Sequence, residues 1–232
     1  MGLNNENITP EMMAGKPWLC FDIETAPMPD CAQYLTDPIE APANYKDPLK
    51  IAAWIEEKRA KQIADAALDL DLCEVVALGT LGRGYSVTMT RREYAEADML
   101  RCFWDLAAGP LLIGFNCLSF DLPILLRRSL YLGIPTPKIA IDKYRHEGVI
   151  DVADVLTFSG KMTWRSLSFY ARRFGIPHDD SVKGEDIGRL VVAGEWDTVA
   201  AHVRTDVETT AALAQRIGLI HQAQPANEMA VV

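Results

Sequence analysis

One short segment near the beginning of the chain restricts the possible folds more than any other. In residues 17–25, PWLCFDIET, three apolar side chains alternate with a cysteine and with Asp22 and Glu24, and prolines follow. This alternation predicts a β-strand, and a strand with so apolar a run belongs inside a sheet. The remaining segments must therefore supply neighbouring strands and the helices that cover them.

Strand-like and helix-like segments alternate through the rest of the chain. Further strands are expected at 73–81, 85–90 and 111–116, and either a strand or a helix at 149–158. Helical periodicity is present at 49–69, 93–108, 121–133, 166–175, 185–194 and 195–217. This order predicts an α/β fold. We expect a single domain over residues 1–232, with a core at about 17–217, a proline-rich irregular excursion at 27–48 and a flexible tail at 218–232.

The composition is that of an ordinary globular protein, with 49% hydrophobic and 24% charged residues. These fractions exclude a disordered or collagen-like chain. Five cysteines without paired spacing fit free thiols in a reducing compartment. Neither a signal peptide nor an apolar run long enough to cross a bilayer is found. The sequence therefore predicts a cytoplasmic protein with no membrane partner.

The net charge is −9, from 23 basic and 32 acidic residues. A module that simply coats nucleic acid should be basic, so the charge argues against that class. The distribution is uneven, because residues 127–189 contain eleven Lys and Arg but only eight Asp and Glu. Basic side chains of this region, Arg127, Arg128 and Lys183 among them, are candidates for phosphate contacts, although most are expected to be solvated helix faces.

Acidic side chains occur at three places where ligands are commonly bound. Asp22 and Glu24 are two residues apart on a strand, so both project from one face near its C-terminal end. Asp121 stands between a strand and a helix, and Asp206 follows His202 by four residues on a helix, so these two share a face. Each acid also has a structural interpretation: solvated strand-end acids, a helix cap, or a surface i,i+4 pair.

The combination is more informative than its parts. If the four acids converge, like charges about 4 Å apart repel by about 4 kcal/mol at an effective dielectric near 20. Such a cluster requires cations or raised pKa values. Oxygen ligands favour Mg²⁺ or Mn²⁺, and two such ions suit phosphoryl chemistry.

Three segments also resemble a known family. FDIET (21–25), GFNCLSFDLPIL (114–125) and HVRTDVETT (202–210) are similar to the three exonuclease motifs of the DEDD 3′–5′ exonuclease superfamily. The spacing within 114–125 is most similar to the proofreading domain of family B DNA polymerases. Residues 166–177 and 183–187 extend the similarity to stand-alone polymerase-B-like exonucleases of bacteria and phages.

The resemblance implies a ribonuclease H-like fold with a mixed central β-sheet flanked by α-helices. It implies two divalent cations, Mg²⁺ or Mn²⁺, held by the acids Asp22, Glu24, Asp121 and Asp206. The implied reaction is hydrolysis from the 3′ end of single-stranded or frayed DNA, which releases nucleoside monophosphates. Positions that match substrate contacts are Thr25, Met28, Asn116 and Phe120, although Met28 and Phe120 have core packing as an alternative, and Asn116 a turn.

His202 departs from the family pattern. Family B-like members usually have Tyr four residues before the last acid, and the branch that uses His has it five residues before. Our hypothesis is that His202 orients or deprotonates the attacking water, since an imidazole pKa near 6.5 suits a general base.

Alternatives remain open at this point. The same chemistry would serve a 3′–5′ exoribonuclease, and the histidine leaves room for an inactive nucleic-acid-binding or polymerase-associated subunit. Partners would be DNA 3′ ends or RNA, and a DNA polymerase or another replication or repair protein. The 27–48 excursion is a candidate clamp for the 3′ end. We expect Asp151 to have a structural or supporting role, and His146, His178 and His221 to be structural.

Overall fold

The computed structural model describes residues 17–139 and 148–220. Within these residues, five strands form one sheet in the order β3-β2-β1-β4-β5. The central strand β1 pairs antiparallel with β2 and parallel with β4, while β2–β3 is antiparallel and β4–β5 is parallel. The strands are β1 (Trp18–Pro27), β2 (Cys73–Gly82), β3 (Tyr85–Thr90), β4 (Leu111–Gly114) and β5 (Val149–Asp151). The predicted mixed sheet and the central place of the first strand are confirmed.

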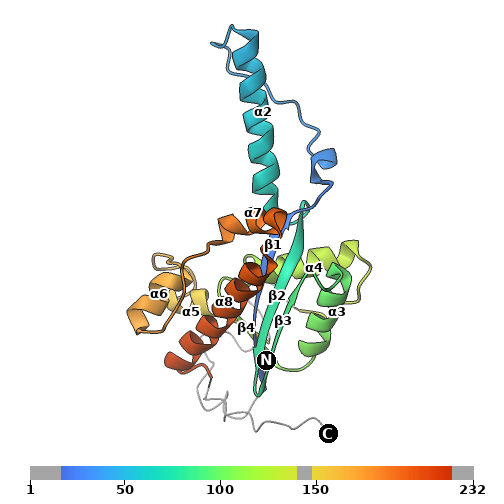
Figure 1. Cartoon of the computed structure of the whole chain (residues 1–232). Coiled ribbons are helices and arrows are strands. Elements are labelled where there is room, and N and C mark those ends of the chain that lie inside the picture. The colour runs from blue at the N-terminus through green and yellow to red at the C-terminus, as the bar shows by residue number, and fades with distance from the viewer. Residues whose placement is uncertain (1–16, 140–147, 221–232) are drawn as a thin grey trace.

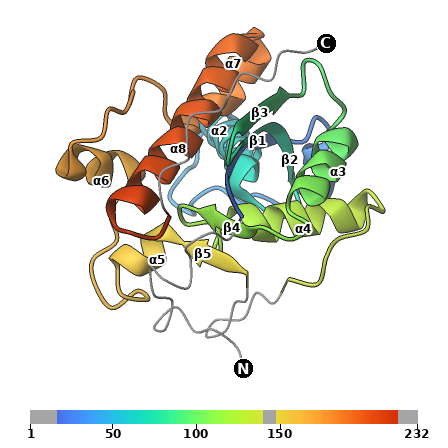
Figure 2. The same ribbon diagram turned by 90° about the horizontal axis from the view of Figure 1, so that it is seen from below.

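Helices cover both faces of the sheet (Figures 1 and 2). One face carries α3 (Glu96–Leu106) and α4 (Asp121–Tyr131), and the other carries α8 (Trp196–Arg216) with α5 (Val152–Leu156), α6 (Leu167–Phe174) and α7 (Ile187–Ala193). Short 3₁₀ turns are η2 (Cys31–Tyr34), η3 (Ala66–Leu68) and η4 (Gly184–Asp186). None of the helices in the described segments is both long and apolar enough to cross a membrane.

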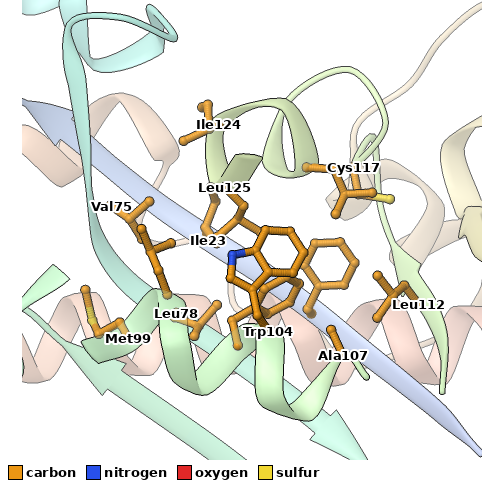
Figure 3. Close-up of a cluster of buried hydrophobic side chains, with 14 of the residues drawn as sticks. Ile23, Val75, Leu78, Met99, Trp104, Ala107, Leu112, Cys117, Ile124 and Leu125 are labelled. Atoms are coloured by element: carbon orange, nitrogen blue, oxygen red, sulfur yellow. The ribbon is translucent and has the colours of Figure 1, made fainter. Parts of the chain in front are cut away.

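The two faces of β1 point into different parts of the core. Leu19, Phe21 and Ile23 point into the core beneath α3 and α4, where Figure 3 shows Ile23 among the apolar side chains. The Phe21 ring lies 5.1 Å from that of Phe103, centroid to centroid. Cys20 belongs to the core on the opposite face. The strand alternation therefore places Asp22 and Glu24 toward α8.

Helix α8 lies close to the sheet because Gly79 in β2 has no side chain. Gly79 pairs with Asp22 across the β1–β2 ladder. A Cβ atom at this position would lie 2.9 Å from Val207 Cγ2 and 3.1 Å from the Val203 carbonyl oxygen. Glycine thus leaves the space that α8 needs to pack against the strand carrying the acids.

Residues 32–65, here called the arm, extend away from the sheet (Figure 1). They contain most of η2, an irregular segment and α2 (Pro48–Asp65). None of these residues, all of which the structure describes, is buried. The Arg59 guanidinium donates hydrogen bonds to the carbonyls of Leu35 and Asp37, which ties the outgoing segment to the returning helix. The predicted helix is present, but its apolar side has no core to cover it.

The segment 149–158 contains both a strand and a helix, β5 and α5. The Asp151 carboxylate marks the change from strand to helix, because it caps α5 by accepting hydrogen bonds from the Ala153 and Asp154 amides.

The prediction that Arg128 is a candidate phosphate contact is wrong. Arg128 is 7% exposed and forms a two-pronged ion pair with Glu96, with N–O distances of 2.9 and 2.8 Å.

Candidate metal centre and active site

A pocket of about 680 Å³ lies between the sheet and the helices on the α8 side. It opens at the C-terminal ends of β1 and β4, where α/β proteins usually bind ligands. Seven of the predicted site residues line it: Asp22, Glu24, Asn116, Phe120, Asp121, His202 and Asp206. The C-terminal part of the central strand β1, the start of α4 and the middle of α8 thus bring the three motifs to one place.

Asp121 is fixed by a hydrogen bond to the central strand. It is the first residue of α4, and Phe120 is the N-cap. Its Oδ1 atom accepts from the Ile23 amide at 3.1 Å, so Asp121 is bound to the residue that lies between the two strand acids. As the acid in the first turn of α4, Asp121 also lies where the helix dipole favours a negative charge.

The other side of the pocket is formed by α8. Val199, Val203 and Val207 form its buried stripe, as the sequence predicts. His202 Nε2 lies 3.4 Å from Glu24 Oε1 and 4.0 Å from Asp206 Oδ2. The H-x-x-x-D pair is therefore directed toward the strand acids and is not a solvated surface pair.

Burial and mutual repulsion change the protonation of the acids. Burial, followed by the neighbouring carboxylates, raises the pKa values of Asp22 and Glu24 well above their ordinary range. Burial also raises the pKa of Asp121 and that of Asp206 to about 7 each. The pocket concentrates more negative charge than it can hold without a cation or protons.

Burial has the opposite effect on the histidine. It lowers the pKa of His202, and the nearby His178 lowers it further. The imidazole is therefore neutral at pH 7, and its contact with Glu24 is not an ion pair there. A neutral imidazole can accept a proton, which a protonated one cannot.

The donor set fits a divalent cation. Single ligand atoms of Glu24, His202 and Asp206 all lie within 4.8 Å of one another. Asp206 Oδ1 is buried and has no hydrogen-bond partner among the described residues. A buried carboxylate oxygen without a partner is costly, and a cation would satisfy it. Carboxylate-rich sites suit Mg²⁺ and Mn²⁺, which prefer oxygen ligands.

Two predicted substrate contacts do not line this pocket. The Thr25 hydroxyl donates a 2.6 Å hydrogen bond to the Ala67 carbonyl, and the side chain is buried. The Met28 sulfur accepts from Arg128 Nη1 at 3.0 Å, beside the buried Glu96–Arg128 pair. Both side chains thus have hydrogen-bond partners within the protein. Their roles in substrate binding stay predictions.

The turn before α4 is held by Asp151. Its carboxylate accepts from the Asn116 amide at 2.8 Å and from the Leu118 amide at 3.1 Å. This arrangement holds Asn116 with a φ of 59°, a left-handed conformation that asparagine tolerates better than most residues. Asp151 thus has the supporting role that was expected of it.

Sequence reasoning missed several side chains of the pocket. Trp164, His178 and Asp180 line it, and so does Lys183, which was expected only as a candidate phosphate contact. His178 was expected to be only structural, and its Nδ1 lies 3.1 Å from the Thr209 hydroxyl while the ring borders the pocket. These residues lie in loops whose course depends on tertiary packing, so no periodicity could reveal them. His146 and His221 lie outside the described residues, as does 221–232 of the predicted tail.

Comparisons with known proteins identify the family of the chain. Residues 61–228 match the family described as predicted 3′–5′ exonucleases related to the exonuclease domain of PolB. The matched range contains Asp121, His202 and Asp206, whereas Asp22 and Glu24 lie before it. The search of curated proteins found no match.

The fold is also similar to that of a solved polymerase. The family B DNA polymerase of the hyperthermophilic archaeon Pyrobaculum calidifontis superposes with a TM-score of 0.60 and 18% sequence identity. The similarity covers 87% of this chain but only 24% of the polymerase, so the chain spans about a quarter of that protein. The predicted ribonuclease H-like fold is confirmed. Since the family model matches well over half of its length, the chain belongs to the predicted 3′–5′ exonucleases related to the PolB exonuclease domain.

Proposed function

We propose that this protein is a metal-dependent 3′–5′ exonuclease that acts on single-stranded or frayed DNA and releases nucleoside monophosphates. One observation carries the proposal: in a chain of this family, carboxylates from β1, α4 and α8 line a single pocket together with His202. A cluster of this kind is typical of sites that bind divalent cations for phosphoryl chemistry.

The four acids would hold two divalent cations, Mg²⁺ or Mn²⁺: Asp22, Glu24, Asp121 and Asp206. When bound, these ions would supply an activated water and would stabilise the leaving oxygen of the phosphodiester. The unpartnered Asp206 Oδ1 and the raised carboxyl pKa values support this assignment.

His202 is proposed to orient the attacking water or to accept its proton. The ring is buried against the acids, with Nε2 directed at Glu24 and Asp206. Its lowered pKa keeps the ring neutral, and therefore able to accept a proton, at physiological pH. A tyrosine at this position would remain a neutral phenol and could only orient the water.

Digestion of matched DNA and RNA oligomers tests the proposal. With Mg²⁺ or Mn²⁺, a 5′-labelled DNA strand should shorten stepwise, whereas a 3′-labelled strand should release labelled mononucleotide at once. Asp206→Asn is the control and should abolish both. Faster loss of RNA would favour the exoribonuclease, and binding without shortening of either oligomer would favour an inactive binding subunit.

The biological partner is a separate proposal. A polymerase or another replication or repair protein is the expected partner, because the matched fold in Pyrobaculum calidifontis is part of a DNA polymerase. A cytoplasmic location stays a prediction from the sequence.

A further inference from the structure

The loop between α5 and α6 carries three exposed apolar side chains, and this loop contributes to the wall of the carboxylate pocket. Phe158, Met162 and Trp164 are 67%, 59% and 55% exposed. Single exposed apolar residues are common, but three within one short loop indicate a contact surface. Of the three, Trp164 also forms part of the pocket wall.

One side of Trp164 is anchored to the core. Its ring centroid lies 6.4 Å from that of Phe115 at an interplanar angle of 56°. Phe115 directly follows β4, and its ring lies 6.2 Å from that of Tyr170 on α6. Such tilted aromatic pairs are favourable contacts. The indole is therefore held by Phe115, which itself packs against α6, while more than half of the Trp164 surface remains exposed.

Basic side chains accompany the exposed indole. Lys161 and Arg165 flank it in sequence, and Lys183 lines the same pocket. None of these three forms an ion pair with another residue of the described chain. The pocket itself thus combines carboxylates with an aromatic face and the Lys183 ammonium, and the loop beside it adds Lys161 and Arg165, the latter over the Phe169 ring. This is the chemistry that a strand requires, because bases stack on aromatic faces while phosphates contact cations.

We propose that Trp164, supported by Phe115, is a stacking platform for an unpaired base of the strand whose 3′ end enters the carboxylate pocket. The inference rests on the proposed exonuclease function and specifies its substrate class: a nucleic-acid end whose bases are unpaired. A base inside a duplex is already stacked on both faces, so it cannot use this platform. Selection of single-stranded and frayed ends then follows from one side chain.

Binding measurements test the platform directly. A 5′-fluorescein single-stranded oligomer is titrated into Asp206→Asn protein, with and without Trp164→Ala, and followed by anisotropy. Loss of one stacked base weakens binding by about tenfold or more. Trp164→Phe keeps an aromatic face and should restore most of the affinity. Tyr94→Ala is the matched control, since Tyr94 is 44% exposed in the loop just before α3 and does not line the carboxylate pocket, so its loss should leave affinity unchanged.

Fluorescence and substrate preference give readouts that a merely structural role would not change. The oligomer should quench the tryptophan emission of Asp206→Asn protein, and Trp164→Phe should remove most of this quenching. With active protein, Trp164→Ala should raise KM on single-stranded substrate with little change in kcat. The ratio of kcat/KM on single-stranded to blunt duplex DNA should fall.

Failure of the platform can be told apart from failure of the exonuclease proposal. If the protein shortens oligomers and Trp164→Ala binds and discriminates as the wild type does, the platform is wrong and the exonuclease proposal stands. The platform is also wrong if Tyr94→Ala weakens binding as much. If no oligomer is shortened but the oligomer still quenches Trp164, the platform stands and the exonuclease proposal fails.

Discussion

Burial acts in opposite directions on the two titratable side chains that α8 brings to the pocket. It raises the pKa of Asp206 to about 7 and lowers that of His202. Without cations, the pocket at neutral pH therefore holds acids that resist ionisation beside an imidazole that resists protonation. A divalent cation would reverse the first effect, because it stabilises the charged carboxylates.

The first prediction concerns pH and the stability of the metal-free protein. Asp121 and Asp206 have pKa values of about 7 in the folded protein and an ordinary value of 3.8. Between about pH 4 and 7, the folded state keeps protons that the unfolded state has released, so the contribution of these groups to stability is lost as pH rises. Asp206→Asn should therefore become increasingly more stable than wild type over this range. Thermal unfolding in EDTA measures the difference.

The exposed Asp105→Asn on α3 is the control for that series and should show no such trend. Addition of Mg²⁺ or Mn²⁺ above about pH 7 should raise the Tm of wild type more than that of Asp206→Asn. A constant difference between wild type and Asp206→Asn across the range would contradict the assigned pKa values.

The second prediction concerns His202. His202→Ala should lower kcat by about 10²-fold or more, the usual contribution of a general base. Wild-type kcat should fall as pH decreases through a value below the ordinary 6.5, because protonation removes the base. His202→Tyr should retain part of the activity and lose this acidic limb. Full turnover by His202→Ala from about pH 6 to 9 would make the histidine a bystander.

At the scale of elements, the distance between α8 and the sheet determines the site. Asp22 on β1 pairs with Gly79 on β2, and the missing side chain of Gly79 is the space that Val203 and Val207 of α8 approach. His202 and Asp206 each precede one of these valines. The contact that packs the buried stripe against the sheet therefore also places His202 and Asp206 in the pocket.

The third prediction follows from this packing. Gly79→Ala would place a Cβ 2.9 Å from Val207 Cγ2 and 3.1 Å from a backbone oxygen, so α8 must move. We expect a loss of about 1–3 kcal/mol in the free energy of unfolding. Activity should fall about tenfold or more, because small displacements of reacting groups are costly. Denaturant unfolding and oligomer digestion measure the two effects.

A matched glycine provides the comparison. Gly188 lies in α7, and a Cβ there would have its nearest contact at 3.7 Å, an ordinary distance. Gly188→Ala should leave activity unchanged and keep or slightly raise stability. Adding Val207→Ala to Gly79→Ala should recover part of the activity by removing Cγ2. Equal effects of the two glycine substitutions would refute the close-approach argument.

The sequence was most informative where local geometry determines side-chain direction. Two-residue spacing placed Asp22 and Glu24 on one face of β1, and four-residue spacing placed His202 beside Asp206. It was less informative where tertiary packing decides. Trp164 reaches the pocket from an irregular loop, and Arg128 is buried because Glu96, from another helix, neutralises it. Neither outcome is encoded in a local pattern.

At the scale of the whole molecule, the arm is the feature that departs from a compact shape (Figure 1). The chain segments that lead into and out of the arm meet at the sheet, where the Met28 amide donates to the Leu72 carbonyl at 2.9 Å. The residue Leu68, in the turn that follows α2, lines the carboxylate pocket. The arm, which contains most of the 27–48 excursion, therefore rises from the margin of the pocket, and the clamp for a 3′ end stays a prediction.

The fourth prediction is that the arm contributes to substrate capture and not to folding. Replacing residues 32–65 by a short Gly-Ser linker should change Tm little, because none of these residues, all of them described, is buried. KM for a single-stranded oligomer should rise by about tenfold, which corresponds to ~1.4 kcal/mol of binding. The kcat and the Mn²⁺ affinity should stay close to wild type. An unchanged KM in the linker variant would show that the arm does not clamp the substrate.

The position of β1 has a practical consequence for anyone who shortens this polypeptide. The recognisable family stretch starts at residue 61, so a fragment cut to that boundary lacks the strand that joins β2 to β4. What remains is two separate strand pairs, β2–β3 and β4–β5, with no hydrogen bonds between them. Two of the four acids, Asp22 and Glu24, are also missing. Expression of that fragment should yield insoluble material, and its inactivity would be uninformative about the enzyme.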